Sequence, residues 1–260
     1  MPDEERGFLT PQAQLRPLMD LVGVRRLRVS SDSRFLLEVK RFVLRPGDRV
    51  AIVGDSGVGK STCLDMLALT LAPTRWERFD ACFEDEGRAI GELWRRGQRS
   101  ALAGLRARHI GYILQTGGLL PFLTVRENVA LPLRLLGESP ATARARAETL
   151  LQRLQMAGLG RRLPTDLSLG QRQRVAVARA LVHRPALVLA DEPTASLDRR
   201  NAEGVLGLFA ELLQEQGRAA IWVTHSAELA AAHGFIPIPC RVEPDAEGGS
   251  RSVISYDGTP

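Results

Sequence analysis

Residues 54–61 read Gly-Asp-Ser-Gly-Val-Gly-Lys-Ser, and this stretch decides the fold. Two glycines stand with four residues between them, and Lys and Ser follow directly. The preceding residues 49–53, Arg-Val-Ala-Ile-Val, have the apolar character of a short buried strand, and residues 61–69 have the character of a helix. In this order of strand, loop and helix, the spacing indicates a phosphate-binding loop. An ordinary glycine-rich turn is the alternative, and the flanking pattern argues against it.

The chemistry of this loop suits a chain of phosphates. Its glycines tolerate backbone conformations that a side chain would block, and its N–H groups and the positive end of the following helix point at anions. Lys60 can reach the outer phosphates, and the hydroxyl of Ser61 can ligate Mg²⁺. Of 35 basic residues only Lys40 and Lys60 are lysine, so a compact ammonium is retained in this loop by an otherwise Arg-rich chain. The residues expected to bind nucleotide here are Gly54, Asp55, Ser56, Gly57, Val58, Gly59, Lys60, Ser61 and Thr62.

The composition argues against several other classes of protein. The chain has 260 residues, of which 44% are hydrophobic and 25% charged, as in an ordinary globular protein. Its net charge is +5, but the basic residues are dispersed and aromatic residues make up only 5%, so we expect no nucleic-acid partner. No signal peptide is visible, and no stretch approaches the roughly 18 apolar residues of a membrane span. Three distant cysteines predict neither a disulfide framework nor a zinc site, so we expect a cytoplasmic protein.

Apolar stretches alternate with helical patterns along the chain, which predicts an α/β fold with an open, mostly parallel sheet. Residues 1–20 are expected to be partly loose, and residues 73–108 are polar with a weak helical pattern at their end. Strands are expected at residues 35–44, 49–53, 109–114, 186–190 and 219–223, and helices at 61–69, within 124–158, at 171–183 and at 201–216.

The predicted organisation is a single domain with a separate helical lobe. The nucleotide-binding core is expected to combine about residues 20–115 and 166–235, and the lobe about residues 116–165. Pro132 is expected to kink the first helix of the lobe. Residues 236–260 are expected to form edge strands or a tail.

A second motif follows another apolar strand. Residues 187–190, Leu-Val-Leu-Ala, lead directly into Asp191 and Glu192. In a protein with a phosphate loop, an acid at the end of a neighbouring strand holds Mg²⁺, so we assign this task to Asp191. Glu192 is then placed to accept a proton from an attacking water. The pair alone is a weak signal, since carboxylates often begin a loop, and it gains force from the phosphate loop.

Two further polar residues end predicted strands. His225 follows Trp-Val-Thr, and Gln115 follows Ile-Leu. A surface histidine that starts a turn is the alternative for His225, but both strands should deliver their carboxyl ends to one crevice of the sheet. Ser168 precedes a helical pattern, and helix physics alone explains it as a simple N-cap.

Together these residues resemble the ATP-binding cassette ATPases, over roughly residues 20–230. Six motifs occur in the order found in that family, and the ordered set is far more specific than any one of them. Residues 123–133, Leu-Thr-Val-Arg-Glu-Asn-Val-Ala-Leu-Pro-Leu, are most similar to the branch with lipoprotein-release, macrolide-export and cell-division ATPases. The motifs are the phosphate loop 54–61, the glutamine Gln115, the signature 167–171, the strand and acids 187–192, the dimer-crossing loop 196–198 and the switch histidine His225.

The resemblance implies a P-loop NTPase fold with a mostly parallel core sheet, an antiparallel β subdomain and a helical subdomain. It implies ATP hydrolysis with Mg²⁺, in which Glu192 is the base and His225 supports the γ-phosphate and the water. Two such domains would pair head to tail as a homodimer that encloses two ATP molecules. The Mg²⁺ ligands would be Ser61, Gln115 and Asp191, and the residues reaching the partner's nucleotide would be Ser168, Gly170, Gln171 and Asp198.

The resemblance also implies transmembrane permease subunits as partners. The chain would then sit at the inner face of the cell membrane as a peripheral subunit that drives transport or mechanical work. Two alternatives remain: a soluble ATPase switch of the same family, as in DNA repair or translation, and a regulatory module that binds ATP and hydrolyses it weakly. The absence of sustained heptads and the single set of motifs argue against the first, and Glu192 with His225 argue against the second.

The chain departs from the family pattern in three places. Leu169 stands where the signature usually has Gly, so either the backbone there is strained or the loop accepts Leu in an ordinary conformation. Residues 24–34, expected as the loop that stacks an aromatic ring on adenine, contain no aromatic residue, and Phe35 is the possible substitute. Residues 73–100 match the family poorly.

Overall fold

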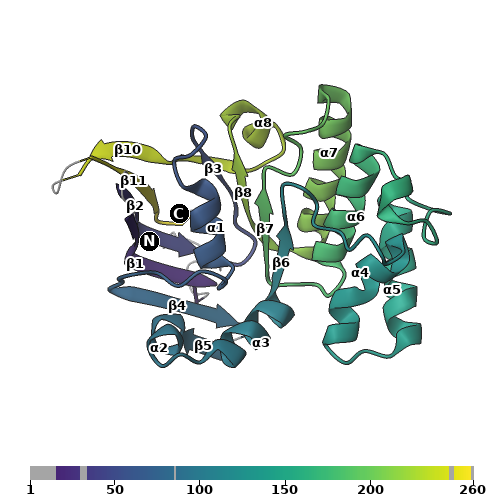
Figure 1. The fold of residues 1–260 in the computed structure, drawn as a ribbon, viewed down its shortest axis with the longest axis horizontal. Helices are drawn as coiled ribbons and strands as arrows, with labels where there is room; N and C mark the ends of the chain where they lie inside the picture. Colours follow the sequence, from purple (N-terminus) through teal and green to yellow (C-terminus); the bar gives the residue numbers. More distant parts are fainter. Residues whose placement is uncertain (1–15, 30–33, 85, 246–248, 259–260) are drawn as a thin grey trace, which may run out of the picture.

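A computed structural model describes residues 16–29, 34–84, 86–245 and 249–258. It contains two sheets and a group of helices (Figure 1). Within the described residues, no helix is both long enough and apolar enough to span a bilayer.

A parallel sheet of five strands occupies the middle of the molecule, in the order β6-β7-β8-β3-β9 (Figure 1). Each neighbouring pair runs parallel, so all five carboxyl ends lie along one edge. The strands are β3 (Arg49–Val53), β6 (Ile110–Ile113), β7 (Leu187–Asp191), β8 (Ala219–Thr224) and β9 (Ile236–Pro239).

A second sheet of six strands, in the order β10-β11-β2-β1-β4-β5, lies beside it (Figure 1). Its pairs are antiparallel except for β11 and β2, which run parallel. The strands are β1 (Met19–Val29), β2 (Arg34–Leu44), β4 (Arg78–Phe83), β5 (Glu86–Ala89), β10 (Arg241–Pro244) and β11 (Ser250–Tyr256).

The helices divide between the two faces of the parallel sheet. Helix α1 lies on the face toward the antiparallel sheet, and α4 to α7 lie on the opposite face (Figure 1). The helices are α1 (Lys60–Leu67), α2 (Ile90–Arg95), α3 (Arg99–His109), α4 (Val125–Leu135), α5 (Pro140–Arg153), α6 (Leu169–Leu181), α7 (Arg199–Gln216) and α8 (Ala227–Ala232), with a 3₁₀ turn η2 at Pro164–Asp166.

The apolar strands of the parallel sheet supply two cores at once. In β7, Leu187 and Leu189 point into the core around α1, and Val188 and Ala190 point into the core under α4 to α7. Strand β8 alternates in the same way, with Ile221 on one face and Trp222 on the other. Successive side chains of a strand face opposite ways, so a continuous apolar run is what a sheet covered on both faces requires.

One buried side-chain amide fixes the turn that leads into α4. Asn128 in α4 is fully buried, and its Nδ2 donates to the carbonyl oxygens of Leu120, Leu123 and Thr124 at 2.9–3.1 Å. Its Oδ1 accepts from the N–H of Leu120 at 2.8 Å. Thr124 and Glu127 form a capping box at the start of the same helix. One side chain therefore satisfies most of the backbone of the turn that leads into α4.

The structure confirms the predicted α/β fold with a mostly parallel sheet, and it corrects three local expectations. Residues 73–108, expected to be polar with only a weak helical pattern at their end, also contain β4, β5 and α2. Residues 24–29 belong to β1 and are not a loop, while residues 30–33 lie outside the described residues. In the C-terminal region, β9 and β10 are edge strands, but β11 lies between β10 and β2. Pro132 is inside α4. The division of the chain into a nucleotide-binding core and a helical lobe remains a prediction.

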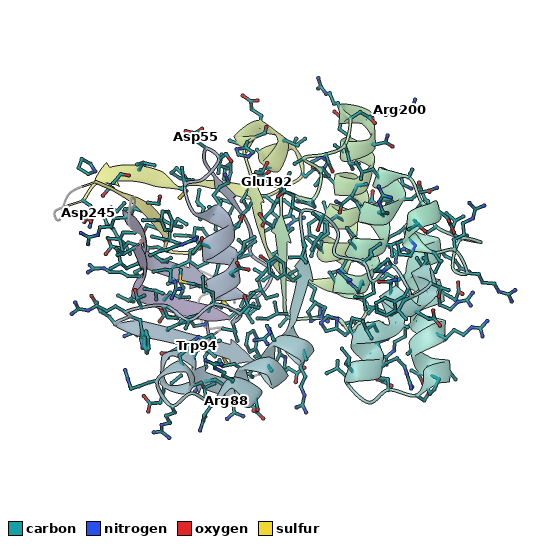
Figure 2. All side chains as sticks on the ribbon, in the orientation of Figure 1. Asp55, Arg88, Trp94, Glu192, Arg200 and Asp245 are labelled. Carbon is teal, nitrogen blue, oxygen red and sulfur yellow. The ribbon has the colours of Figure 1, made fainter. Side chains whose placement is uncertain are left out.

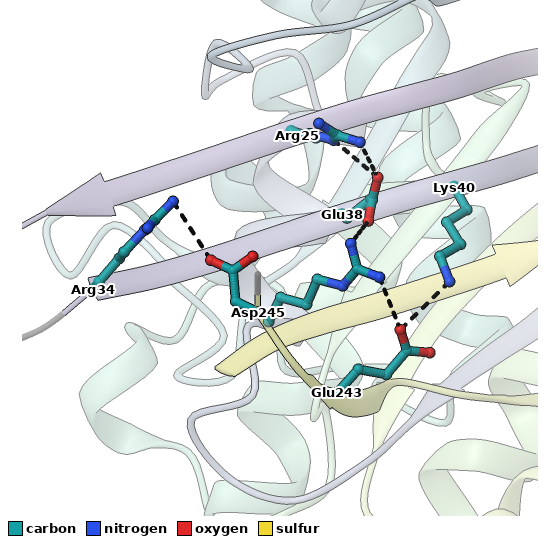
Figure 3. Close-up of polar contacts among 7 residues, drawn as sticks. Arg25, Arg34, Glu38, Lys40, Glu243 and Asp245 are labelled. Carbon is teal, nitrogen blue, oxygen red and sulfur yellow. Dashed lines mark hydrogen bonds and ion pairs between the residues drawn. The ribbon is translucent and has the colours of Figure 1, made fainter. Parts of the chain in front are cut away.

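A buried carboxylate joins the C-terminal strands to the rest of the antiparallel sheet (Figure 3). Glu38 in β2 is 4% exposed, and its Oε1 accepts from Arg25 Nε of β1 at 2.8 Å. Its Oε2 accepts from Arg251 Nη1 of β11 at 3.0 Å. Arg251 also contacts Glu243 of β10 at 3.2 Å, so four strands meet in one network. A buried carboxylate is tolerated only with such partners.

We predict that Arg251→Ala lowers the free energy of unfolding by about 1.5–3 kcal/mol, because Glu38 loses a charged hydrogen bond while staying buried. Urea unfolding followed by circular dichroism measures this change. Arg88→Ala is the matched control: Arg88 pairs with Glu86, both residues are exposed, and the expected loss is below about 0.5 kcal/mol. Equal losses in the two variants would contradict a structural contribution of the Glu38 network.

Candidate active site

The carboxyl ends of β3, β8 and β7 bring the predicted motifs to one edge of the parallel sheet. The phosphate loop follows β3, His225 follows β8, and Asp191 ends β7. Asp55 of the loop and Glu192 lie at this same edge, uppermost in Figure 2. The expected acid is not on the strand next to β3, because β8 lies between β3 and β7. His225 therefore comes from the strand between the phosphate loop and the two carboxylates.

Glycine is required at the last position before Lys60. Gly59 has a φ of 94°, a left-handed conformation that side chains rarely adopt. A Cβ atom built on Gly59 would lie 2.4 Å from Cζ of Phe35, so the ring also occupies the space a side chain would need. Both the backbone conformation of Gly59 and the ring of Phe35 in β2 therefore exclude a side chain at this position.

The ammonium of Lys60 is folded back over this loop. Lys60 is 4% exposed, and its Nζ donates to the carbonyl oxygens of Gly54 at 2.8 Å and Asp55 at 2.7 Å. The Oε1 atom of Glu192 lies 3.8 Å from the same nitrogen. A buried charge needs this compensation, and its partners are ones that phosphate oxygens can replace.

Ser61 and Asp191 form a pair of hard oxygen donors. Ser61 Oγ donates to Asp191 Oδ1 at 3.1 Å. Burial raises the pKa of the Asp191 carboxyl, and the nearby Glu192 acts in the same direction while the hydrogen bond from Ser61 opposes it. A buried carboxylate whose charged form is disfavoured gains by meeting a cation.

This donor set fits Mg²⁺ bound jointly with phosphate. Among the described residues, no group of three or more His, Cys, Asp and Glu side chains could hold a metal ion by itself. Mg²⁺ typically keeps several waters and takes one or two protein oxygens together with substrate phosphates. Ser61 and Asp191 supply that number of protein oxygens beside the loop.

Among the described site residues other than glycine, Glu192 alone has a left-handed backbone conformation. Its φ is 42°, in the left-handed region, where a residue with a Cβ costs on the order of 1–3 kcal/mol. Its N–H donates to the carbonyl oxygen of Val223 in β8 at 3.1 Å, which holds the strained residue in place. Its Oε1 lies 2.5 Å from Nε2 of His225. The carboxylate is therefore fixed between His225 and Lys60, and no feature of the sequence pattern predicted this strain.

A hydrogen bond between β6 and α1, next to the site, was not predicted from the sequence. Tyr112 of β6 donates its hydroxyl to Asp65 Oδ1 of α1 at 3.1 Å. Burial raises the pKa of Tyr112, and the charges of Asp65 and Asp191 act in the same direction. The pair joins β6, which precedes Gln115, to α1, which carries Ser61, and only the three-dimensional arrangement could have revealed it.

Gln115 stands at the start of a loop that α6 holds. Its carbonyl oxygen accepts from Nε2 of Gln173 at 3.0 Å. Arg179 donates to the carbonyl oxygens of Gly117 and Gly118 at 2.8 and 2.6 Å. The residue is exposed, and within the described part of the chain its side chain makes no hydrogen bond to Ser61 or Asp191. The fold thus positions the backbone of Gln115 rather than its amide group.

The signature residues and Asp198 begin two neighbouring helices. Ser168 caps α6 in a reciprocal box with Gln171, through bonds of 3.0 and 3.3 Å. Asp198 caps α7, and its pKa is lowered chiefly by the hydrogen bond from the Asn201 side chain. A Cβ atom on Gly170 would lie 3.6 Å from Oδ1 of Asn201, so the two helix starts are adjacent. No hydrogen bond joins them to the phosphate loop within the ranges that the structure describes.

Of the two alternatives left open at Leu169, the structure shows the ordinary, unstrained conformation. Leu169 is the first residue of α6, directly after the Ser168 cap, and its φ is not in the left-handed region. Helix N-termini accept leucine without backbone cost, and the side chain is 37% exposed. Strain at this edge of the molecule belongs to Glu192 instead.

Comparisons with known proteins give one consistent result. A family profile described as ABC transporter matches residues 37–195. The lipoprotein-releasing system ATP-binding protein LolD of Shewanella denitrificans is 43% identical over 203 residues, which cover 77% of this chain and 82% of that protein. The uncharacterized ABC transporter ATP-binding protein YbbA of Escherichia coli K12 is 42% identical over 192 residues, or 73% and 79% of the two chains.

Solved structures agree. The ATP-binding cassette MJ0796, in a dimeric post-hydrolysis state bound to ADP and Pi, superposes with a TM-score of 0.71 at 31% identity. That alignment covers 85% of this chain and 93% of the other. A second dimeric structure of MJ0796, described as a bacterial ABC transporter cassette, gives a TM-score of 0.69 at 28% identity.

We predict that Leu169→Gly does not raise the basal ATP hydrolysis of the isolated chain, because an unstrained helical residue has no strain to release. Glycine at an exposed helix position costs up to about 1 kcal/mol, so the expected result is equal or slightly lower turnover. Steady-state phosphate release without any membrane partner measures it. A clear increase in turnover would show that leucine restrains the site by some other contact.

Proposed function

This chain belongs to the ABC transporter family, and from that premise we propose which of its residues bind ATP, hold Mg²⁺ and activate the attacking water. As a member it is an ATP-binding subunit that hydrolyses ATP and works with a membrane permease. The observation that carries the residue assignments is the meeting of three side chains: Oε1 of Glu192 lies 2.5 Å from Nε2 of His225 and 3.8 Å from Nζ of Lys60.

Nucleotide binding begins with an exchange of partners at Lys60. Its Nζ leaves the carbonyl oxygens of Gly54 and Asp55 and takes the β- and γ-phosphate oxygens of ATP. The N–H groups of the loop and the start of α1 contribute the remaining donors, since helix N-termini favour anions. The same exchange separates Lys60 from Glu192 and leaves that carboxylate to the water.

Ser61 and Asp191 would hold Mg²⁺, with Gln115 as a third ligand delivered by its loop. When bound, the ion neutralises charge that develops on the phosphate oxygens. The 3.1 Å contact between Ser61 and Asp191 and the raised pKa of Asp191 support this pair. The exposed side chain of Gln115 would have to turn inward on binding.

Glu192 would act as general base. Nε2 of His225 would donate to Oε1 of Glu192, and Oε2 would stay available for the water. His225 would thereby orient the carboxylate and support the γ-phosphate. The side chain of Glu192 is 16% exposed, which strengthens its interaction with the reacting groups relative to bulk water.

The second copy of the chain would complete the site. Ser168, Gly170, Gln171 and Asp198 would approach the nucleotide of the partner in a head-to-tail homodimer. Their position at two adjacent helix starts with free N–H groups supports this arrangement, and both MJ0796 structures are described as dimeric. In such a dimer the complex would lie at the cytoplasmic face of the cell membrane, held there by the permease.

The arrangement of the site also weighs on the two alternatives. A weakly hydrolysing regulatory module would not need a base held in a strained conformation beside its histidine, so the geometry of Glu192 favours active hydrolysis. The similarity to subunits of a lipoprotein-releasing system favours coupling to a membrane complex over a soluble switch.

We predict that Glu192→Gln keeps ATP affinity and lowers turnover by about 10²–10⁴-fold, because the amide accepts no proton. Retained ATP should also favour the dimer, which light scattering detects alongside phosphate release. Glu215→Gln is the control, since Glu215 of α7 is exposed and its ion-pair partner is Arg153 at the end of α5. Turnover within a few-fold of the wild type would remove Glu192 from this function.

We predict that Lys60→Ala abolishes measurable ATP binding or turnover, because the loop loses its only charge on the outer phosphates. Fluorescent-nucleotide titration and phosphate release measure both effects. The other lysine offers a matched control: Lys40 is exposed and contacts Glu243 at 3.4 Å, so Lys40→Ala should leave both unchanged. An unaltered dissociation constant in a folded Lys60→Ala variant would exclude the phosphate-loop assignment.

A further inference from the structure

We propose that Arg28, assisted by Arg26 and Phe35, forms the subsite for the base of the nucleotide, with the Arg28 guanidinium stacked on the base where an aromatic ring would be expected. The inference rests on the proposed function, because it takes the phosphates to lie on the loop at residues 54–61. It adds the residues that contact the base and the consequence for which nucleotides bind.

A pocket of about 610 Å³ continues directly from the phosphate loop. Ligand pockets for small molecules typically span about 300–1,000 Å³, so its size suits the ribose and base. Gly57 and Gly59 of the loop form one wall, and Thr62 and Asp65 of α1 form another. The remaining lining comes from the antiparallel sheet, through Arg26, Arg28 and Phe35.

These three side chains share one face of that sheet. Arg28 of β1 pairs directly with Phe35 of β2 in the antiparallel register, so their Cβ atoms stand about 5 Å apart on the same side. Arg26 is two residues before Arg28 in the same strand and therefore points to the same face. The register of β1 and β2 therefore places two arginines and one aromatic ring on the face of the sheet that borders the loop.

Phe35 is the fixed element of this surface. Its ring lies over Gly59, where an added Cβ atom would approach Cζ to 2.4 Å and Cε2 to 3.1 Å. The ring is packed against the core around α1. Because its ring packs over the loop, it lines the pocket where the loop and the sheet meet.

The two arginines differ in how they are held. Arg26 Nη1 donates to the carbonyl oxygen of Ala72 at 3.0 Å, which anchors its guanidinium at the pocket wall. Arg28 is exposed, and among the described residues its side chain has no hydrogen-bond or ion-pair partner. A planar guanidinium stacks on aromatic faces, and a long side chain without another partner is available to do so.

In such stacking the guanidinium contacts the π-face of the base and not its hydrogen-bonding edge. Every base has a π-face, so affinity gained in this way is tolerant of base identity. We therefore expect adenine and guanine nucleotides to bind with dissociation constants within about fivefold of each other. GTP would be hydrolysed alongside ATP.

The test compares ligands with and without a base. Isothermal titration calorimetry with Mg²⁺ measures ADP, GDP and inorganic pyrophosphate binding to the wild type, Arg28→Ala and Arg28→Lys. In Arg28→Ala we expect ADP and GDP to bind about 5- to 100-fold more weakly and pyrophosphate to change less than twofold. Arg28→Lys keeps the charge but loses the planar face, so it should resemble Arg28→Ala.

The outcomes separate the alternatives. Equal weakening of pyrophosphate and ADP in Arg28→Ala, or full recovery in Arg28→Lys, would mean that Arg28 acts on phosphate as a charge and would overturn the proposal. Unchanged ADP binding in Arg28→Ala would overturn it as well. Lys60→Ala must weaken all three ligands, and if it does not, the phosphate-loop assignment itself fails. Arg88→Ala, on exposed β5, should change none of them.

Discussion

The arrangement at the sheet edge follows from the burial of one ammonium group. Lys60 is 4% exposed and holds its charge against two loop carbonyl oxygens, with the Glu192 carboxylate at 3.8 Å. Such a charge is stable only if oxygen atoms surround it, and this requirement fixes the curl of the loop and the direction of Glu192. In the proposed function, phosphate oxygens of the nucleotide would replace these carbonyl oxygens around the same nitrogen.

Much of this site could be predicted because its determinants are local in the sequence. The phosphate loop lies between a five-residue strand and a helix, and both elements formed where the apolar pattern placed them. Asp191 and His225 follow short apolar runs, and parallel strands necessarily bring their carboxyl ends to one edge. Sequence spacing and the rule for parallel sheets were sufficient for these residues. Their catalytic tasks remain predictions, because proximity alone does not measure them.

The features that escaped prediction depend on tertiary packing. Strand β5 is exposed along its whole length, so it has no alternating apolar pattern to reveal it. The Tyr112 to Asp65 bond joins residues 47 positions apart, and the left-handed φ of Glu192 is imposed by the neighbouring strand. At Leu169 the sequence left strain and an ordinary conformation open, and the structure shows that a leucine after a serine cap is ordinary helix. A residue that departs from the family pattern, such as Leu169, therefore need not strain the backbone.

The late strands of the chain have a consequence for biosynthesis. Strand β9 covers the open side of β3, and β11 covers the open side of β2, so both sheets are finished by residues 236–256. In a nascent polypeptide that has reached α8, β3 and β2 are each paired on one side only. Unpaired strand edges recruit other strands, and chains fold as they emerge. Until residues 236–256 have been added, each of the two sheets therefore keeps an open strand edge of the kind that promotes association with other chains.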